Sequence, residues 1–139
     1  MDFAKLKQIL SLPAYTGLSI SAAEVLINTK NIAVKVPITV HDIEAYLTAS
    51  RKLLAITDSA NTAAREAVLG LAKFDSFDTL NPAYLATLTA LLDGLVTASL
   101  ITTTDKTNIL AMGDAMISQA EQAGLGIVNA GHIQATGVI

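Results

Sequence analysis

The stretch Leu80–Ala98 reads LNPAYLATLTALLDGLVTA and predicts the central helix of the fold. Asn81 followed by Pro82 is a strong start signal, because asparagine caps free N–H groups and proline fits the first helical turn. Beyond it, leucines recur at spacings of three, four and three residues, namely Leu85, Leu88, Leu92 and Leu95. This spacing places them on one face. We therefore expect a core helix ending near Ala98, with Leu80 packed as a staple against Leu85.

Shorter helix signals lie on both sides of this stretch. Capping residues precede apolar runs of helical spacing at Asp2, Ser21, Thr39, Ser59, Thr102 and Ser118, and a last turn is expected from Asn129 to Thr136. Ser21 and Ser118 each stand three residues before a glutamate, which is the pattern of a capping box, and Gly124 is a typical stop. The residues 73–79 are expected to form a loop. These signals predict an all-α fold, with six or seven short helices packed as a compact single domain over 1–139.

Two segments differ from this helical pattern and are candidate arms at an interface. The residues 32–38 are rich in β-branched side chains, including Val34 and Val36, and contain a proline, which favours an edge strand or an extended linker. Such a strand could add to the sheet of a neighbouring subunit, and an extended loop is the alternative.

The second candidate arm is the C-terminal segment 126–139, which has no Asp, Glu, Lys or Arg. Its apolar residues are Ile127, Val128, Ile133, Val138 and Ile139. A terminus of this kind frays in water unless something holds it. It either packs on the chain's own core or docks on a neighbouring subunit.

The amino-acid composition also indicates a protein that binds a partner. Hydrophobic residues make up 52% of the 139 residues and charged residues only 15%, compared with about 25% charged in a typical domain. A surface with so few charges tends to be covered by a partner. Lys and Arg form no basic cluster, so we expect no nucleic-acid partner. Asp93 interrupts the most apolar run, 80–101, so we expect no membrane span.

The sequence contains no recognisable catalytic, cofactor or metal motif. It has no cysteine, and its two histidines, His41 and His132, lie far apart. Asp75 and Asp78 lack the alternating ligands and the terminal glutamate of a calcium loop. Neither a Gly-x-Ser-x-Gly elbow nor a phosphate-binding glycine loop is present. We therefore predict that the protein is not an enzyme, and an unrecognised carboxylate site is the remaining alternative.

The final third of the chain resembles a group of small tailed-bacteriophage proteins. The resemblance rests on the segments 80–111, 117–126 and 128–133, where ISQAEQAGLG and VNAGHI follow a group pattern of approximately S-R-A-E-E-L-G-L-G-x-V-x-x-G-D-V. The segments 15–19 and 38–43 also fit. This sequence has Gln119 where the group commonly has arginine, and His132 where it commonly has aspartate, so an ion pair between those two positions would be missing here.

The resemblance implies a function in the virion. Members of the group are encoded in the tail and structural gene region, so the implied function is that of a structural virion component, attached at the tail or baseplate. Its partners would be other virion proteins or copies of itself, and it would be made in the cytoplasm of the infected bacterium. A phage assembly chaperone or a host-directed binding module, absent from the particle, is the alternative.

Overall fold

The computed structural model describes residues 1–139, which pack into two compact units. The terminal unit joins both ends of the chain, Met1–Val34 and Met116–Ile139, and the central unit is Lys35–Ala115. Each unit has its own hydrophobic core. The structure therefore differs from the expectation of one compact domain over 1–139. No linker-like composition marks the boundary, because the chain crosses it in extended strands and the terminal unit combines segments far apart in the sequence.

Two strands carry the chain across this boundary. β1 (Ile32–Lys35) pairs with β4 (Asp114–Ile117) in a two-stranded sheet. Next to this pair, the Val36 amide donates to the Gly113 carbonyl oxygen at 2.9 Å. The extended conformation predicted for 32–38 is therefore present, but β1 pairs with a strand of its own chain and not with a neighbour's sheet.

A second, shorter strand pair lies within the central unit. β2 (Ile38–Thr39) runs antiparallel to β3 (Ser76–Phe77), with Ile38 opposite Phe77. Both of these side chains are buried in the core. The sequence predicts a loop at 73–79 because a two-residue strand is too short to show alternation. With two strand pairs, the fold is mainly α, and the all-α prediction is wrong in this respect.

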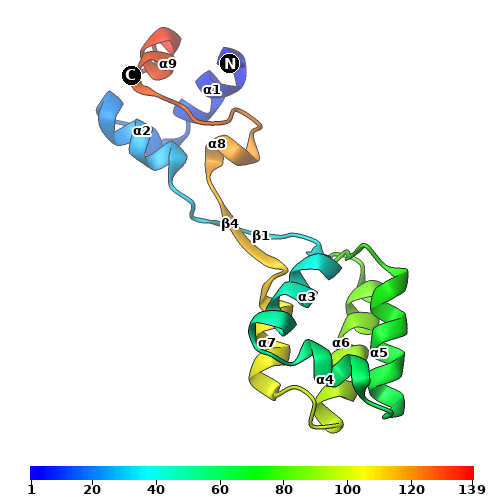
Figure 1. The fold of residues 1–139 in the computed structure, drawn as a ribbon. Helices are drawn as coiled ribbons and strands as arrows, with labels where there is room; N and C mark the ends of the chain where they lie inside the picture. Colours follow the sequence, from blue (N-terminus) through cyan, green and yellow to red (C-terminus); the bar gives the residue numbers. More distant parts are fainter. The chain divides into compact units, whose positions relative to one another are not determined.

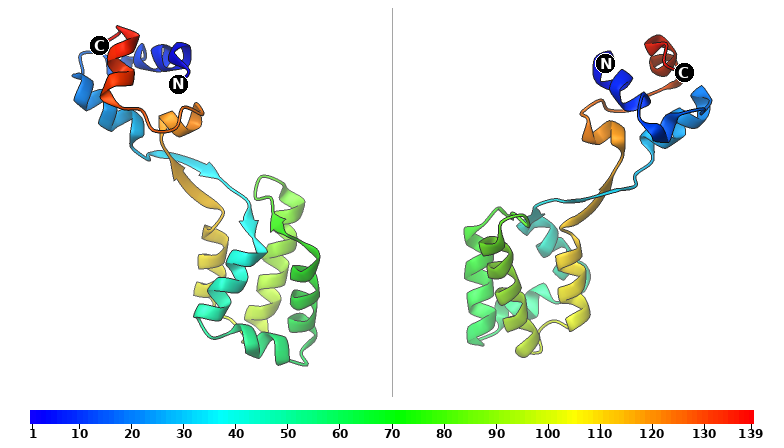
Figure 2. Two further views of the ribbon diagram at one scale, coloured as in Figure 1. Left: turned by 45° about the horizontal axis from the view of Figure 1, so that its top comes forward. Right: turned by 180° about the vertical axis from the view of Figure 1, so that it is seen from behind.

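Five helices form the rest of the central unit (Figure 1). They are α3 (Val40–Ala49), α4 (Leu53–Asp58), α5 (Thr62–Lys73), α6 (Pro82–Thr97) and α7 (Thr103–Ala111). α5 and α6 pack along each other, as both views in Figure 2 show. Small residues permit this close approach, since a Cβ placed on Gly94 would lie 3.1 Å from the Cβ of Ala63.

The central helix predicted over Leu80–Ala98 is α6 (Pro82–Thr97). Asn81 caps it by accepting a hydrogen bond from the Ala83 amide at 3.0 Å. Three of its four predicted core leucines are almost fully buried, namely Leu88, Leu92 and Leu95. The predicted staple is wrong, however: Leu80 is 72% exposed, so it does not pack against the core.

The structure has nine α-helices in place of the six or seven predicted. One reason is that the helix predicted from Thr39 breaks at residues 50–52 and gives α3 and α4 separately. Thr39 is the N-cap of α3, as predicted, and its side chain accepts from the Asp42 amide at 3.1 Å. The helix expected from Ser59 begins instead after Asn61, whose side chain caps α5.

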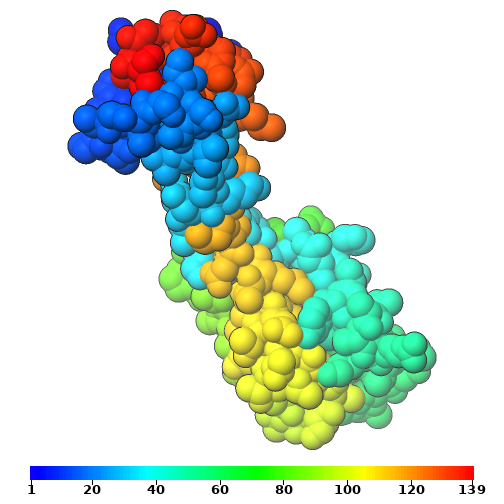
Figure 3. All heavy atoms as spheres, turned by 90° about the vertical axis from the view of Figure 1, so that its left-hand side faces the viewer, coloured from blue at the N-terminus to red at the C-terminus, as the bar shows by residue number.

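The terminal unit is built from four α-helices and one short 3-10 turn. They are α1 (Phe3–Leu10), the 3-10 turn (Pro13–Tyr15), α2 (Ile20–Asn28), α8 (Gln119–Gln122) and α9 (Ala130–Thr136). α9 packs against both α1 and α2. Figure 3 shows the N-terminal and C-terminal residues, in blue and red, massed together in this unit. The two chain ends therefore share one hydrophobic core.

Most caps of the terminal unit are the predicted ones. Asp2 caps α1, Asn129 caps α9, and Ser118 forms the predicted capping box with Glu121. α2 is an exception, because its N-cap is Ser19, which accepts from the Ala22 amide at 3.2 Å. Ser21 therefore lies inside the helix, and the capping box predicted for it does not form.

Candidate interaction surfaces

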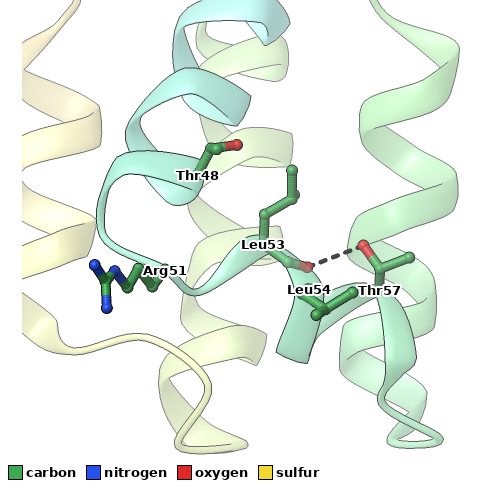
Figure 4. A pocket seen from close by; sticks show the side chains of 5 residues that line it. All are labelled: Thr48, Arg51, Leu53, Leu54 and Thr57. Carbon is green, nitrogen blue, oxygen red and sulfur yellow. Dashed lines mark hydrogen bonds between the residues drawn. The ribbon is translucent and has the colours of Figure 1, made fainter.

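A shallow apolar pocket of about 380 Å³ lies at the bend between α3 and α4 (Figure 4). It is lined by Thr48 of α3, by Arg51 in the bend, and by Leu53, Leu54 and Thr57 of α4. Leu53 packs against the core of the central unit, whereas Leu54 is 71% exposed. An exposed leucine beside an open apolar pocket is typical of a surface that a partner covers. We call this surface the bend pocket.

The bend itself has a strained residue. Arg51 has a φ of 60°, in the left-handed region that glycine usually occupies. The Arg51 amide donates to the Thr48 carbonyl oxygen at 3.0 Å, and the Lys52 amide donates to the Leu47 carbonyl oxygen at 2.8 Å. These two hydrogen bonds form a Schellman motif, in which the left-handed position normally holds glycine. Arg51 forms no ion pair within the chain, and Figure 4 shows its guanidinium pointing away from Leu54 and Thr57.

We expect Arg51→Gly to raise the free energy of unfolding by about 0.5–1 kcal/mol. The left-handed backbone costs a side-chain residue ~1–2 kcal/mol, and the extra freedom of glycine in the unfolded chain offsets part of the gain. Urea titration followed by circular dichroism measures the change. Ser99→Gly is the matched control, because Ser99 has a φ of 59° in the same motif after α6. A destabilised Arg51→Gly beside a stabilised Ser99→Gly would mean that the arginine side chain supports the fold.

A buried carboxylate lies next to the bend. Asp105 is 6% exposed and forms an ion pair with Lys52, the residue that follows Arg51. Tyr46 Oη donates to Asp105 Oδ1 at 2.9 Å, and the Thr102 amide donates to Asp105 Oδ2 at 2.7 Å. Asp105 also completes the capping box of α7 with Thr102. These bonds tie the bend to the start of α7.

The environment of Asp105 favours its ionised form. The hydrogen bond from Lys52, and then the bond from the Thr102 amide, hold the pKa of this carboxyl well below its usual range, although burial acts in the opposite direction. The hydrogen bonds hold the carboxylate of Asp105 in place between the bend and the first turn of α7. The sequence marks Asp105 only as part of a helix start, because Tyr46 and Lys52 are more than fifty positions away.

A second exposed patch lies on the connection between α5 and α6. It consists of the exposed residues Asp75, Asp78 and Leu80 together with the half-buried Phe74 and with Tyr84 in the first turn of α6, and we call it the loop patch. Leu80 is the most exposed of its apolar members, and the ring of Phe74 contacts that of Tyr84 edge to face, at 6.1 Å. Neither Asp75 nor Asp78 forms an ion pair. The patch therefore combines an exposed leucine with two carboxylates outside ion pairs, and Asp78 Oδ1 accepts a hydrogen bond from the Leu80 amide at 3.0 Å.

The structure separates the predicted interface residues into two groups. Val128 and Ile133 are fully buried in the core of the terminal unit, and Val138 and Ile139 pack against it. The C-terminal segment therefore packs on its own core, which was one of the two alternatives, and Val138 and Ile139 remain half-buried at its surface. Ile127 is 85% exposed and stays a candidate.

The two residues predicted on the extended arm, Val34 and Val36, are both half-buried. They lie in β1 and directly after it, where the backbone pairs with the segment around β4.

Asn28 explains why the C-terminal segment is held in place. Its side-chain amide donates to the Val128 carbonyl at 2.6 Å, and its side-chain oxygen accepts from the Val128 amide at 3.1 Å. Both polar groups of a buried backbone residue are thereby satisfied. The sequence gives no signal for this contact, because the two residues are 100 positions apart.

The structure also shows where the two histidines lie that were considered as catalytic or metal-binding residues. His41 is exposed near the start of α3, and His132 accepts from the Asn129 amide at 3.3 Å in the capping box of α9. No group of three or more His, Asp or Glu side chains is close enough to hold a metal ion. No helix combines the length and the apolar character needed to cross a bilayer.

Comparisons with protein-family models, with curated proteins and with solved structures find no match to this chain.

Proposed function

We propose that this protein is a structural component of a bacteriophage virion, associated with the tail or baseplate, which acts through protein–protein assembly. The observation that carries the proposal is a pair of exposed leucine surfaces on one compact unit. Leu54 at the bend pocket and Leu80 on the loop patch are each more than two-thirds exposed, although they belong to a chain with few charges. Burial of these side chains against a partner would remove apolar surface from water and so favour association.

The sequence resemblance to small tailed-bacteriophage proteins supports the location within the virion. It involves α8 and the start of α9, where the capping boxes of Ser118 and Asn129 are formed. The group's arginine and aspartate are replaced by Gln119 and His132, and both lie within helical first turns here. His132 accepts the hydrogen bond that closes the capping box of α9. Position 132 therefore has a structural role here, although the group's aspartate is absent.

Mass spectrometry of purified phage particles tests the proposal. We expect the chain to remain with the particles through density-gradient purification and a high-salt wash, at a fixed ratio to the other structural proteins. The alternative is a phage assembly chaperone or a host-directed binding module, which would be present in the infected lysate and absent from finished particles. That second result would overturn the virion assignment.

A further inference from the structure

Tyr15, in the 3-10 turn of the terminal unit, is a buried tyrosine whose hydroxyl forms no hydrogen bond within the chain. The residue is only 2% exposed, and no hydrogen bond contributes to the environment of its phenol. A buried tyrosine hydroxyl normally finds a partner. The Oη of Tyr46, for comparison, donates to Asp105 and accepts from Asn108. The hydroxyl of Tyr15 is therefore an unused donor at the edge of a hydrophobic core.

This hydroxyl reaches the surface of the terminal unit. No buried side-chain nitrogen or oxygen atom of the chain lacks a partner, so the unpartnered oxygen of Tyr15 must be accessible. The ring is covered, because Tyr15 belongs to the core formed with Leu6 and Ile27. The small exposed part of Tyr15 is therefore its hydroxyl.

The surface at Tyr15 is a hollow of about 440 Å³, which lies entirely within the terminal unit. It is formed by the end of α1, the connection from Tyr15 to α2, and the residues after α9. This volume is in the range of about 300–1,000 Å³ that is usual for small-molecule sites. We call it the tyrosine hollow. Its apolar lining residues are Leu10, Leu18, Val138 and Ile139, and no lining side chain is charged.

Three hydroxyl groups belong to the lining of the tyrosine hollow, and they differ in what they can offer a ligand. Ser11 Oγ donates to the Lys7 carbonyl oxygen at 2.8 Å, so its proton is already used. Thr16 is exposed and is solvated by water. Tyr15 alone combines a free proton with a buried side chain. A ligand that accepts from this hydroxyl would also bury apolar surface against the residues around it.

We propose that the tyrosine hollow binds a small uncharged molecule that has an apolar body and an oxygen acceptor. The apolar lining residues contact the body of the ligand, and Tyr15 Oη donates to its oxygen. A charged ligand is disfavoured, because no lining side chain supplies an opposite charge and desolvation of an unpaired ion is costly. The site lies in the terminal unit, so it is independent of the exposed leucine surfaces on which the proposed virion function rests.

The protonation state of Tyr15 suits this donor role. Burial raises the pKa of the phenol above its usual value, because the ionised form is poorly solvated there. The hydroxyl therefore keeps its proton at neutral pH and remains a donor.

Cyclohexanone is a suitable probe, because it has an apolar ring, no charge and one carbonyl oxygen. In an NMR titration of the ¹⁵N-labelled full-length chain, the amide resonances of Leu18, Val138 and Ile139 should shift and saturate. The expected Kd is on the order of 1–10 mM, since so small a ligand can make few contacts. Shifts that increase linearly without saturation would show that the hollow binds no ligand of this class.

Tyr15→Phe tests the hydroxyl, because it keeps the ring and removes only the donor. The variant should bind cyclohexanone about two- to tenfold more weakly, the usual effect of one lost hydrogen bond. Tyr84→Phe is the matched control, because Tyr84 is a 43% exposed tyrosine of the central unit. It should bind like the wild type, and circular dichroism should show both variants folded.

A measurement on the wild-type chain removes the dependence on a variant that folds. With ¹³C placed at Cζ of every tyrosine, the Tyr15 resonance should move on addition of cyclohexanone, and those of Tyr46 and Tyr84 should not. A Tyr15 Cζ resonance that stays in place while the amides saturate would overturn the inference, as would a folded Tyr15→Phe chain with unchanged affinity. Neither outcome bears on whether the chain is present in virions.

Discussion

Asp105→Ala should lower the free energy of unfolding of the central unit by about 1.5–3 kcal/mol, the usual contribution of hydrogen bonds to a charged group, since the Lys52 side chain is 29% exposed and can be solvated. The change leaves Lys52 without its carboxylate, removes the acceptor for Tyr46, and opens the capping box at Thr102. Urea denaturation followed by circular dichroism measures the loss. Asp93→Ala is the matched control, because Asp93 pairs with Lys106 on the surface with its side chain 55% exposed. It should cost less than about 1 kcal/mol.

The effect of Asp105 should also depend on pH. Its pKa is lowered on folding, so its contribution is fully present above the unfolded pKa of about 3.9 and is lost as the pH falls below it. The stability difference between wild type and Asp105→Asn should therefore be constant near neutral pH and shrink below about pH 4. A difference that persists unchanged at pH 3 would mean that the carboxylate is not the source of the stabilisation.

Local signals in the sequence predicted local structure well. Asn81 and Pro82 start α6, Thr39 caps α3, and Ser118 forms its capping box, because each signal involves residues within one helical turn. Leu88 and Leu92 are buried, as expected, because spacings of three and four residues place apolar side chains on one face of a helix. The mainly helical class follows from these signals.

Features that depend on distant residues were missed. The terminal unit forms from both chain ends, and Asn28 holds Val128 through two hydrogen bonds that no pattern along the chain marks. The same holds for the ion pair between Lys52 and Asp105. Burial of the C-terminal segment follows from this tertiary packing, whereas an apolar terminus by itself is equally consistent with docking on a partner.

The candidate surfaces were missed for a different reason. Leu54 was expected on the apolar face of one long helix, and Leu80 was expected in a staple, since apolar residues near a helix are normally counted as core. Arg51 adopts a conformation usually reserved for glycine, and so it ends α3 where the sequence shows no stop signal. Once α3 ends there, the two leucines that follow lie on a separate short helix, and only Leu53 packs on the core.

Phe77→Ala should destabilise the central unit by about 3–5 kcal/mol, the usual range for removing a buried phenylalanine. Phe77 is fully buried, its ring centroid lies 4.9 Å from that of Phe74, and its backbone pairs with Ile38 across the β2–β3 ladder. A cavity would therefore open between the strand pair and the helices. Urea denaturation followed by circular dichroism measures the change.

The matched control for this substitution is Phe3→Ala. Phe3 is 44% exposed on α1, and its ring meets His132 edge to face, so its removal should cost less than about 1.5 kcal/mol. Equal stability losses in the two variants would show that β3 lies outside the core and that the loop patch has no buried support.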